Sequence, residues 1–288
     1  MLVTLGIWTG FALSIRAIGK SPLAPADVAL LRFGIPGLLL LPLLKQRWAE
    51  IRKVPARYML MILAGGGLPF FFAAAWGGAA TSTAYVGALV AGTAPLFVTL
   101  FGVLLFRQTV TRHRVLGLLF ILGGIAALLW QQLTHLQSHV LSGALYLLGA
   151  SALWGIYTLG IRKSGLDALS CNLLLCTPSF LMICLLLLSG AVPTHLGHFS
   201  LHSALPFILL QGVGVGLIAG FSYGFSISKL GAEKSALIGS LTPALATLCA
   251  IPLMGEPVTA TIMAGILLIT AGVAVANLTF SRKGAQHA

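Results

Sequence analysis

Long apolar runs, each about the length of a membrane-spanning helix, alternate with short polar connections along the whole chain. A helix needs roughly 20 apolar residues to cross the hydrocarbon core of a bilayer. The runs are continuous, whereas strands of a membrane β-barrel alternate polar and apolar positions over about ten residues. The pattern therefore predicts about ten transmembrane helices, at 1–19, 27–44, 58–80, 83–106, 113–131, 139–161, 169–190, 204–228, 232–254 and 258–280.

Lysine and arginine are shared unevenly between the two sets of connections that join these runs. If the N-terminus is cytoplasmic, the cytoplasmic segments hold 14 of the 17 lysines and arginines, and the outer segments hold only Arg16 and Lys20. The remaining one, Arg32, falls within the second run. Because cytoplasmic connections of membrane proteins are enriched in these residues, we expect a multi-pass protein of the inner cell membrane with both termini in the cytoplasm.

The second half of the chain repeats landmarks of the first half. At a spacing of 146 residues, Trp8 is matched by Trp154 and Arg16 by Arg162. At a spacing of 148 residues, Pro95 is matched by Pro243, Gln108 by Glu256, Val110 by Val258, Gly117 by Gly265 and Gly124 by Gly272. Such fixed spacings are the signature of an internal repeat.

Each half contains five predicted helices, so the second half enters the membrane from the opposite side. The sequence thus predicts an all-α integral membrane protein made of two inverted five-helix repeats, at 1–131 and 139–280, followed by a cytoplasmic tail at 281–288. Inverted repeats are the plan of many secondary transporters, whose substrate site lies near the midplane between the halves.

Composition supports this interpretation and excludes several others. Hydrophobic residues make up 58% of the chain and charged residues only 8%, against roughly 25% charged residues in soluble domains. The net charge of +12 comes from scattered basic clusters, so we expect no nucleic-acid partner. The four cysteines lie inside apolar runs without metal-ligand spacing, and we expect neither a metal site nor a cofactor.

Ionisable residues inside a membrane are functional candidates. All five acidic residues fall at helix ends or in connections: Asp27, Glu50, Asp167, Glu233 and Glu256. We therefore expect transport without a buried carboxylate as proton carrier, with Glu233 and Glu256 as the weak exceptions. Arg32 has two interpretations: it attracts a substrate carboxylate, or it extends to the outer interface. We favour the second.

Other motifs that could carry chemistry have simpler explanations. His195, His198 and His202 fall in one outer connection without an acid beside them, which favours a solvated loop over a metal site. The glycine-rich segments 65–67 and 212–216 lie within apolar runs, where small residues allow close helix packing or a hinge. Because no reactive constellation or ring of polar residues is visible, we expect neither an enzyme nor a channel.

Two prolines and six aromatic residues are the candidate site. Pro95 and Pro243 are predicted to kink their helices and to free carbonyls that need a partner or face a cavity; for each, a packed structural kink is the alternative. Tryptophan and tyrosine also mark membrane interfaces. We nevertheless predict that a cavity for a neutral or zwitterionic organic solute is lined by Trp8, Trp76, Tyr85, Trp154, Tyr157 and Tyr223.

Taken together, these features resemble the drug/metabolite transporter superfamily, EamA type. The resemblance rests on ten spans in two halves, on Trp8 and Trp154 early in the first and sixth spans, and on a Pro-x12-Glu-Pro-Val-Thr stretch over 243–259 followed by glycines. Gln108 departs from the pattern, since the family usually has glutamate there.

Within the superfamily the chain is most similar to the YddG-type exporters. That resemblance implies export of amino acids, aromatic ones included, and related metabolites by alternating access. Other members carry sugars, nucleotide sugars, polyamines or drugs, and uptake instead of export stays open. The expected partners are a small-molecule substrate and the lipid bilayer, and we expect a monomer.

Overall fold

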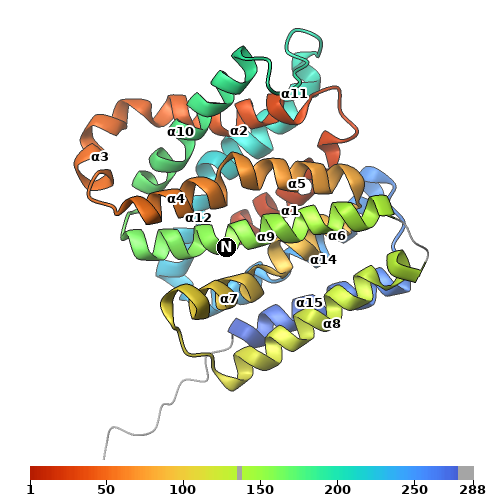
Figure 1. The fold of residues 1–288 in the computed structure, drawn as a ribbon. Coiled ribbons are helices and arrows are strands. Elements are labelled where there is room, and N and C mark those ends of the chain that lie inside the picture. Colours follow the sequence, from red (N-terminus) through yellow and green to blue (C-terminus); the bar gives the residue numbers. More distant parts are fainter. Residues whose placement is uncertain (135–137, 278–288) are drawn as a thin grey trace, which may run out of the picture.

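The structure, a computed structural model, describes residues 1–134 and 138–277, apart from the side chains of 131–134, 232 and 233 (Figure 1). Within these residues every regular element is a helix. Nine helical segments of the described chain are long and apolar enough to cross a membrane, and the 17-residue apolar helix α1 (Leu2–Ile18) is a shorter tenth candidate. The prediction of an all-helical membrane protein with about ten spans is confirmed. The proposed tail at 281–288 lies outside the described residues.

Several spans consist of more than one helical piece. After α1, the helices of the first half are α2 (Pro25–Leu40), η1 (Leu41–Leu43), α3 (Leu44–Ile51), α4 (Ala56–Gly66), α5 (Leu68–Ala80), α6 (Thr83–Val86), the π-helix η2 (Gly87–Gly92), α7 (Ala94–Phe106) and α8 (Arg112–Thr134). In the second half they are α9 (Ser138–Ser164), α10 (Ala168–Leu188), α11 (Leu201–Phe207), the π-helix η3 (Ile208–Ile218), α12 (Ala219–Leu230), α13 (Ala232–Gly239), α14 (Thr242–Met254) and α15 (Ala260–Asn277).

Equivalent spans of the two halves end in the same way. α7 ends at Arg107 and α14 ends at Gly255, 148 residues later, and both residues have left-handed backbone conformations (φ 52° and 65°). The next N–H, of Gln108 or Glu256, donates to a carbonyl six residues earlier, at 3.1 and 3.4 Å. At both helix ends this hydrogen bond satisfies a carbonyl that would otherwise be left free. The two repeats therefore share local geometry as well as sequence.

Four of the repeated glycines join α8 to α15, which lie side by side (Figure 1). A Cβ atom added to Gly117 would lie 2.6 Å from the carbonyl oxygen of Gly272, and one added to Gly124 would lie 2.7 Å from that of Gly265. Both distances are too short for real atoms. Only glycine lets these helix backbones approach so closely.

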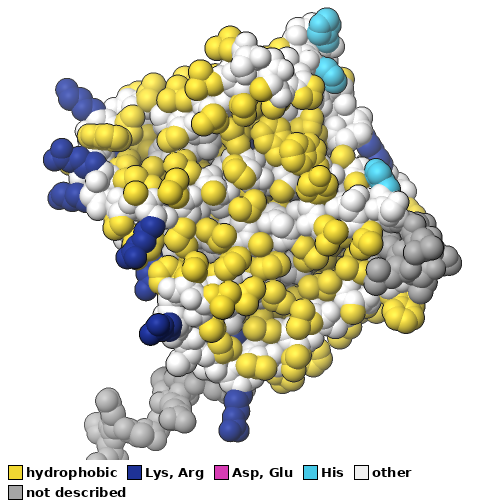
Figure 2. All heavy atoms as spheres, in the orientation of Figure 1, with side chains coloured by type: hydrophobic (Ala, Val, Ile, Leu, Met, Phe, Trp, Pro, Cys, Tyr) yellow, Lys and Arg dark blue, Asp and Glu magenta, His cyan; other side chains and the backbone are white. Residues whose placement is uncertain are grey.

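The two ends of the bundle differ in charge. We call one the basic end; it carries the connections at 52–55, 107–111, 165–167 and 231. We call the other the Glu256 end; it carries the connections at 19–24, 81–82, 189–200 and 255–259. Figure 2 shows lysine and arginine gathered along one edge of the molecule and a broad hydrophobic surface across the helices. That surface is suited to contact with lipid.

Candidate functional site

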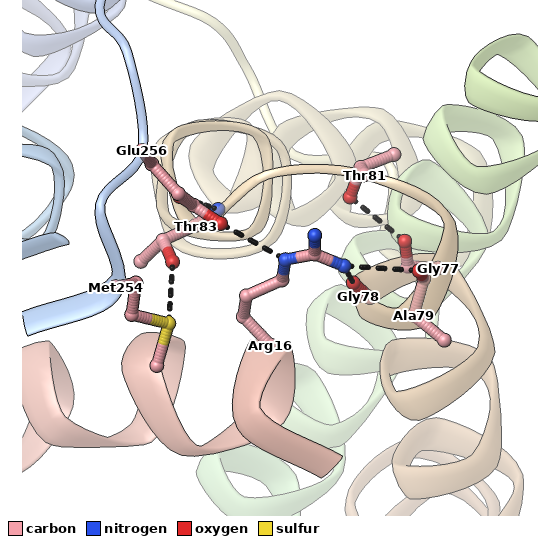
Figure 3. Close-up of polar contacts among 8 residues, drawn as sticks. All are labelled: Arg16, Gly77, Gly78, Ala79, Thr81, Thr83, Met254 and Glu256. Atoms are coloured by element: carbon pink, nitrogen blue, oxygen red, sulfur yellow. Dashed lines mark hydrogen bonds and ion pairs between the residues drawn. The ribbon is translucent and has the colours of Figure 1, made fainter. Parts of the chain in front are cut away.

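An ion pair joins the two repeats at the Glu256 end (Figure 3). Nε of Arg16, in the last turn of α1, donates to Oε1 of Glu256 at 2.9 Å. Nη1 of Arg16 also donates to the carbonyl oxygens of Gly78 and Ala79 at 3.1 and 3.0 Å. The second oxygen of Glu256 accepts the backbone N–H of Thr83 at 2.8 Å. We call these contacts the latch.

The local sequence explains why the latch forms there. The connection between α5 and α6 is only Thr81 and Ser82, so the carbonyls at the end of α5 and the first N–H groups of α6 lie close together and lack helical partners. A guanidinium suits the carbonyl end of a helix and a carboxylate suits the N–H end. Both side chains are largely withdrawn from solvent, with side-chain exposures of 19% for Arg16 and 10% for Glu256.

The equivalent residues at the basic end do not bind one another. Arg162 and Gln108 are both exposed, and the side chain of Gln108 lies back against Gly102 of its own span. Among the described residues, none of the ion pairs involves Arg162. The neighbouring Lys163 instead places its Nζ 5.0 Å from the centre of the Phe106 ring. The repeat thus has a latch at one end only.

Helix packing follows the same difference. At the Glu256 end, α1 packs against α5, α6 and α14. At the basic end, α9 packs against α4 and α7, whereas α12 packs against α13, η3, α1 and α10. The contact of α1 with α14 thus has its equivalent in that of α9 with α7, whereas α12 and α13, the equivalents of α5 and α6, pack mainly against helices other than α9.

Four of the six predicted aromatic residues form two pairs. The rings of Trp8 (α1) and Tyr223 (α12) are 5.0 Å apart, and those of Trp154 and Tyr157 (α9) are 4.7 Å apart. The second pair continues into α5, because Phe70 lies 5.2 Å from Trp154. Each pair thus involves a tryptophan that the repeat had matched.

The other two aromatic residues lie apart from these pairs. Trp76 is 51% exposed on the outer surface of α5, 5.7 Å from the ring of Tyr146. Tyr85 is buried, and its hydroxyl donates to the carbonyl oxygen of Leu128 in α8 at 2.6 Å. That hydrogen bond joins two spans of the first repeat.

Both prolines stand where a broken span resumes as a helix. Pro95 is in the first turn of α7, after η2, and Pro243 is in the first turn of α14, after α13. Hydroxyl groups bind the carbonyls nearby: Thr93 lies 2.6 Å from the oxygen of Leu89, and Thr242 lies 2.7 Å from that of Gly239. The carbonyl that Pro243 frees, that of Gly239 four residues earlier, therefore has a side-chain partner.

The favoured interpretation of Arg32 is wrong. Its side chain does not extend to an interface but is buried, with the residue 5% exposed. Nη1 donates to Oε1 of Gln211 in η3 at 2.6 Å, and Nε2 of Gln211 donates to the hydroxyl of Ser14 in α1 at 2.7 Å. Four phenylalanine rings surround the guanidinium, each with its centre within 6 Å.

The remaining candidates are simpler. The glycine segments lie against other helices, as predicted: a Cβ atom at Gly65 would meet the backbone of α9 at 2.5 Å. The connection at 189–200 is tied to α2, because Asp27 accepts from the Thr194 hydroxyl and the His195 N–H. The described residues hold no cluster of three metal-ligating side chains. The side chain of Glu233 lies outside the described part.

Sequence reasoning did not predict the latch or the Arg32–Gln211 contact. A signal for the latch was present, since Arg16 and Glu256 each had a counterpart in the other repeat. They are an arginine and an acid assigned to connections on the same side of the membrane. The partner of Arg32 had no comparable signal, because Gln211 is one glutamine in a glycine-rich apolar run.

Comparison with known proteins agrees with this architecture. A family model described as "EamA-like transporter family" matches residues 1–130 and again 141–278. The fold is similar to that of a solved crystal structure of a protein with 20% sequence identity and a TM-score of 0.62, over 96% of this chain and 94% of that chain. No curated protein matches the chain in sequence.

Proposed function

The chain belongs to the EamA-like transporter family, and we propose that it exports amino acids, aromatic ones included, and related small metabolites by alternating access. The family is one of membrane transporters, and the apolar helices make this chain a multi-pass membrane protein. The substrate class, the direction and the mechanism are our proposals.

The observation that carries alternating access is the unequal state of the two ends. The latch closes the Glu256 end, while Arg162 and Gln108, its counterparts, are exposed at the basic end. A transporter built from inverted repeats can exchange the conformations of its two halves. The described conformation would then be closed at the Glu256 end, and the alternative state would release the latch.

We propose that the two halves, 1–131 and 139–280, rock about the region between the aromatic pairs. The protein would be a monomer in the inner cell membrane, with both termini in the cytoplasm. The basic end would then face the cytoplasm, in keeping with the positive-inside rule. Solute would enter from the cytoplasm in the described conformation and leave at the Glu256 end.

The aromatic pairs favour an organic solute with an apolar or aromatic part. Aromatic rings bind such groups through large contact areas at little entropic cost. Energy coupling would not use a buried carboxylate. The four acidic side chains that the structure describes are bound near the ends of spans: Asp27, Glu50, Asp167 and Glu256.

Two alternatives stay open. The solute could belong to another class carried by the superfamily, such as a sugar, a polyamine or a drug, and the net direction could be uptake. Direction follows from gradients and not from the residues of the site.

Transport by the purified protein in proteoliposomes tests the proposal. We expect movement of labelled aromatic amino acids down their own gradient, with and without a pH gradient. Trp154→Ala should reduce transport roughly tenfold, from the loss of about 1.5 kcal/mol of aromatic contact. Trp76→Ala, on the exposed surface, is the matched control and should transport normally. Transport of a sugar or polyamine but of no amino acid would refute the substrate class, and strict dependence on the pH gradient would refute uncoupled transport.

A further inference from the structure

Arg32 is a buried charge without a compensating anion. It lies within the α2 span, and the structure packs the rings of Phe11, Phe33, Phe70 and Phe71 around its guanidinium, at 5.3 to 5.9 Å. Cation–π contacts attract a guanidinium, but neutral rings leave its charge in place. A lone charge in a low-dielectric interior is costly, and such residues in membrane proteins serve function more often than stability.

One edge of the Arg32 guanidinium is free. Its single hydrogen bond in the described chain runs from Nη1 to Gln211, and the buried Nε has no partner. Nε and Nη2 together form the edge that matches the two oxygens of a carboxylate. Arg16 provides a comparison within the same molecule, because its Nε is occupied by the carboxylate of Glu256.

No described acid is available to fill that edge. Asp27 accepts from backbone N–H groups and from Thr194 near the Glu256 end, and Glu256 pairs with Arg16. Glu50 and Asp167 share Arg47 near the basic end. The carboxylate that would complete the site must therefore come from outside the described part of the chain, and a solute is the natural source.

The surroundings of the free edge also indicate the rest of the ligand. Phe70 contacts both the Arg32 guanidinium and the ring of Trp154, which in turn lies against Tyr157. The Arg32 guanidinium and an aromatic surface thus lie side by side. Gln211 bonds to Ser14 as well as to Arg32, so the site joins α2 and α1 of the first repeat to η3 of the second.

We infer that Arg32 binds the carboxylate of the transported solute, with the aromatic or large apolar part of that solute against Phe70 and Trp154. The inference rests on the proposed function and makes it more specific. It selects solutes that carry a carboxylate and an apolar group, which include apolar and aromatic amino acids and exclude polyamines and neutral sugars. Since the site contacts both repeats, ligand binding acts on the contact between them.

Binding, measured separately from transport, tests this inference. The probes are 3-phenylpropionate, phenylalanine and phenethylamine, of which only the last lacks a carboxylate. Ligands that bind the folded state raise the thermal unfolding midpoint of the purified full-length protein. We expect both carboxylates to raise the midpoint of the wild type and phenethylamine to have no effect. Arg32→Gln should lower affinity for the carboxylates roughly 10- to 100-fold, as expected for loss of a charge-assisted contact.

The matched control is Arg57→Gln, which removes an exposed arginine near the basic end and should keep wild-type affinities. Arg32→Lys keeps the charge but lacks the two parallel N–H donors of the guanidinium, and we expect roughly tenfold weaker binding of the carboxylates. If Arg32→Gln does not fold, comparison of Arg32→Lys with Arg57→Lys decides. Equal binding of phenethylamine, no carboxylate binding by the wild type, or an unchanged carboxylate preference in the Arg32 variants would overturn the inference. Arg32-dependent binding of 3-phenylpropionate without transport of any amino acid would instead refute the proposed function and leave the carboxylate site standing.

Discussion

The Glu256 end and the basic end carry matched residues in different states. At the Glu256 end, Arg16 of the first repeat binds Glu256 of the second. At the basic end, Arg162 of the second repeat and Gln108 of the first are exposed, and they hold no latch. The two ends share helix order and helix-end geometry, so these two features do not account for the difference.

Two features separate the ends: the chemistry of one residue and the position of one pair of helices. Glutamine in place of glutamate removes the charge that attracts Arg162. Also, α12 and α13 pack with each other and with α1 at the basic end, whereas α5 and α6 pack against α1 at the Glu256 end. A repeat protein can thus bias one of two similar states with few substitutions, because states that differ by a few kcal/mol exchange readily.

Reversing the charge of Arg16 should have the largest effect. Arg16→Glu replaces an ion pair by repulsion and frees the carbonyls of Gly78 and Ala79. The closed state should lose about 2 kcal/mol, a roughly 30-fold shift toward opening. The hydroxyl of Ser82 is buried at this end. In a variant without the native cysteines, Ser82→Cys reports opening of the Glu256 end through its rate of labelling by a membrane-impermeant maleimide.

The control for that variant is the double exchange Arg16→Glu with Glu256→Arg. It restores attraction between the two side chains but not the contacts with backbone carbonyls, so labelling should return only part of the way to wild type. Labelling of Arg16→Glu at the wild-type rate would show that the latch does not hold this end closed.

Gln108→Glu should have a smaller effect, because it adds a second latch at an exposed site. An exposed ion pair contributes less than about 1 kcal/mol, so labelling at Ser82→Cys should rise about two- to fivefold as the basic end closes. The rise should disappear when Arg162→Gln is combined with it. A rise that persists without Arg162 would mean that the two residues do not act as the counterpart of the latch.

Thr83→Ala should have the smallest effect. The hydroxyl makes only a weak contact with Sδ of Met254 at 3.6 Å, while the backbone N–H that binds Glu256 is retained. We expect less than about a twofold change in labelling. Thr83→Pro removes that N–H at the first position of α6, where proline is tolerated, and should open the end more. The reverse order of the two variants would contradict this role for the N–H.

The helix positions could be predicted from the sequence because bilayer thickness sets the length of each apolar run. The runs at 83–106 and 232–254 coincide with the spans from α6 to α7 and from α13 to α14. The π-helix η2 could not be predicted in the same way. Its irregular carbonyls depend on hydroxyls such as that of Ser151, which binds the carbonyl of Val90 from 61 residues away in sequence.

The candidate site was predicted in part, for a similar reason. The repeat singled out Trp8 and Trp154, and both lie in aromatic pairs. Trp76 has the same residue type and an equally apolar setting, yet it faces outward. The sequence could not predict this, because a membrane helix is apolar on its lipid-facing side as well as on its inner side. Arg32 was misread because its partner, Gln211, is 179 residues distant.

Distances across both ends, measured together by electron spin resonance in a variant without native cysteines, test the latch most directly. One label pair, at Ala79 and Ala260, spans the Glu256 end, and the other, at Lys163 and Ser228, spans the basic end; all four positions are exposed. Glu256→Gln should lengthen the first distance and shorten the second in the same sample. If the first distance is unchanged, or if both lengthen, the latch does not govern the exchange between the two ends.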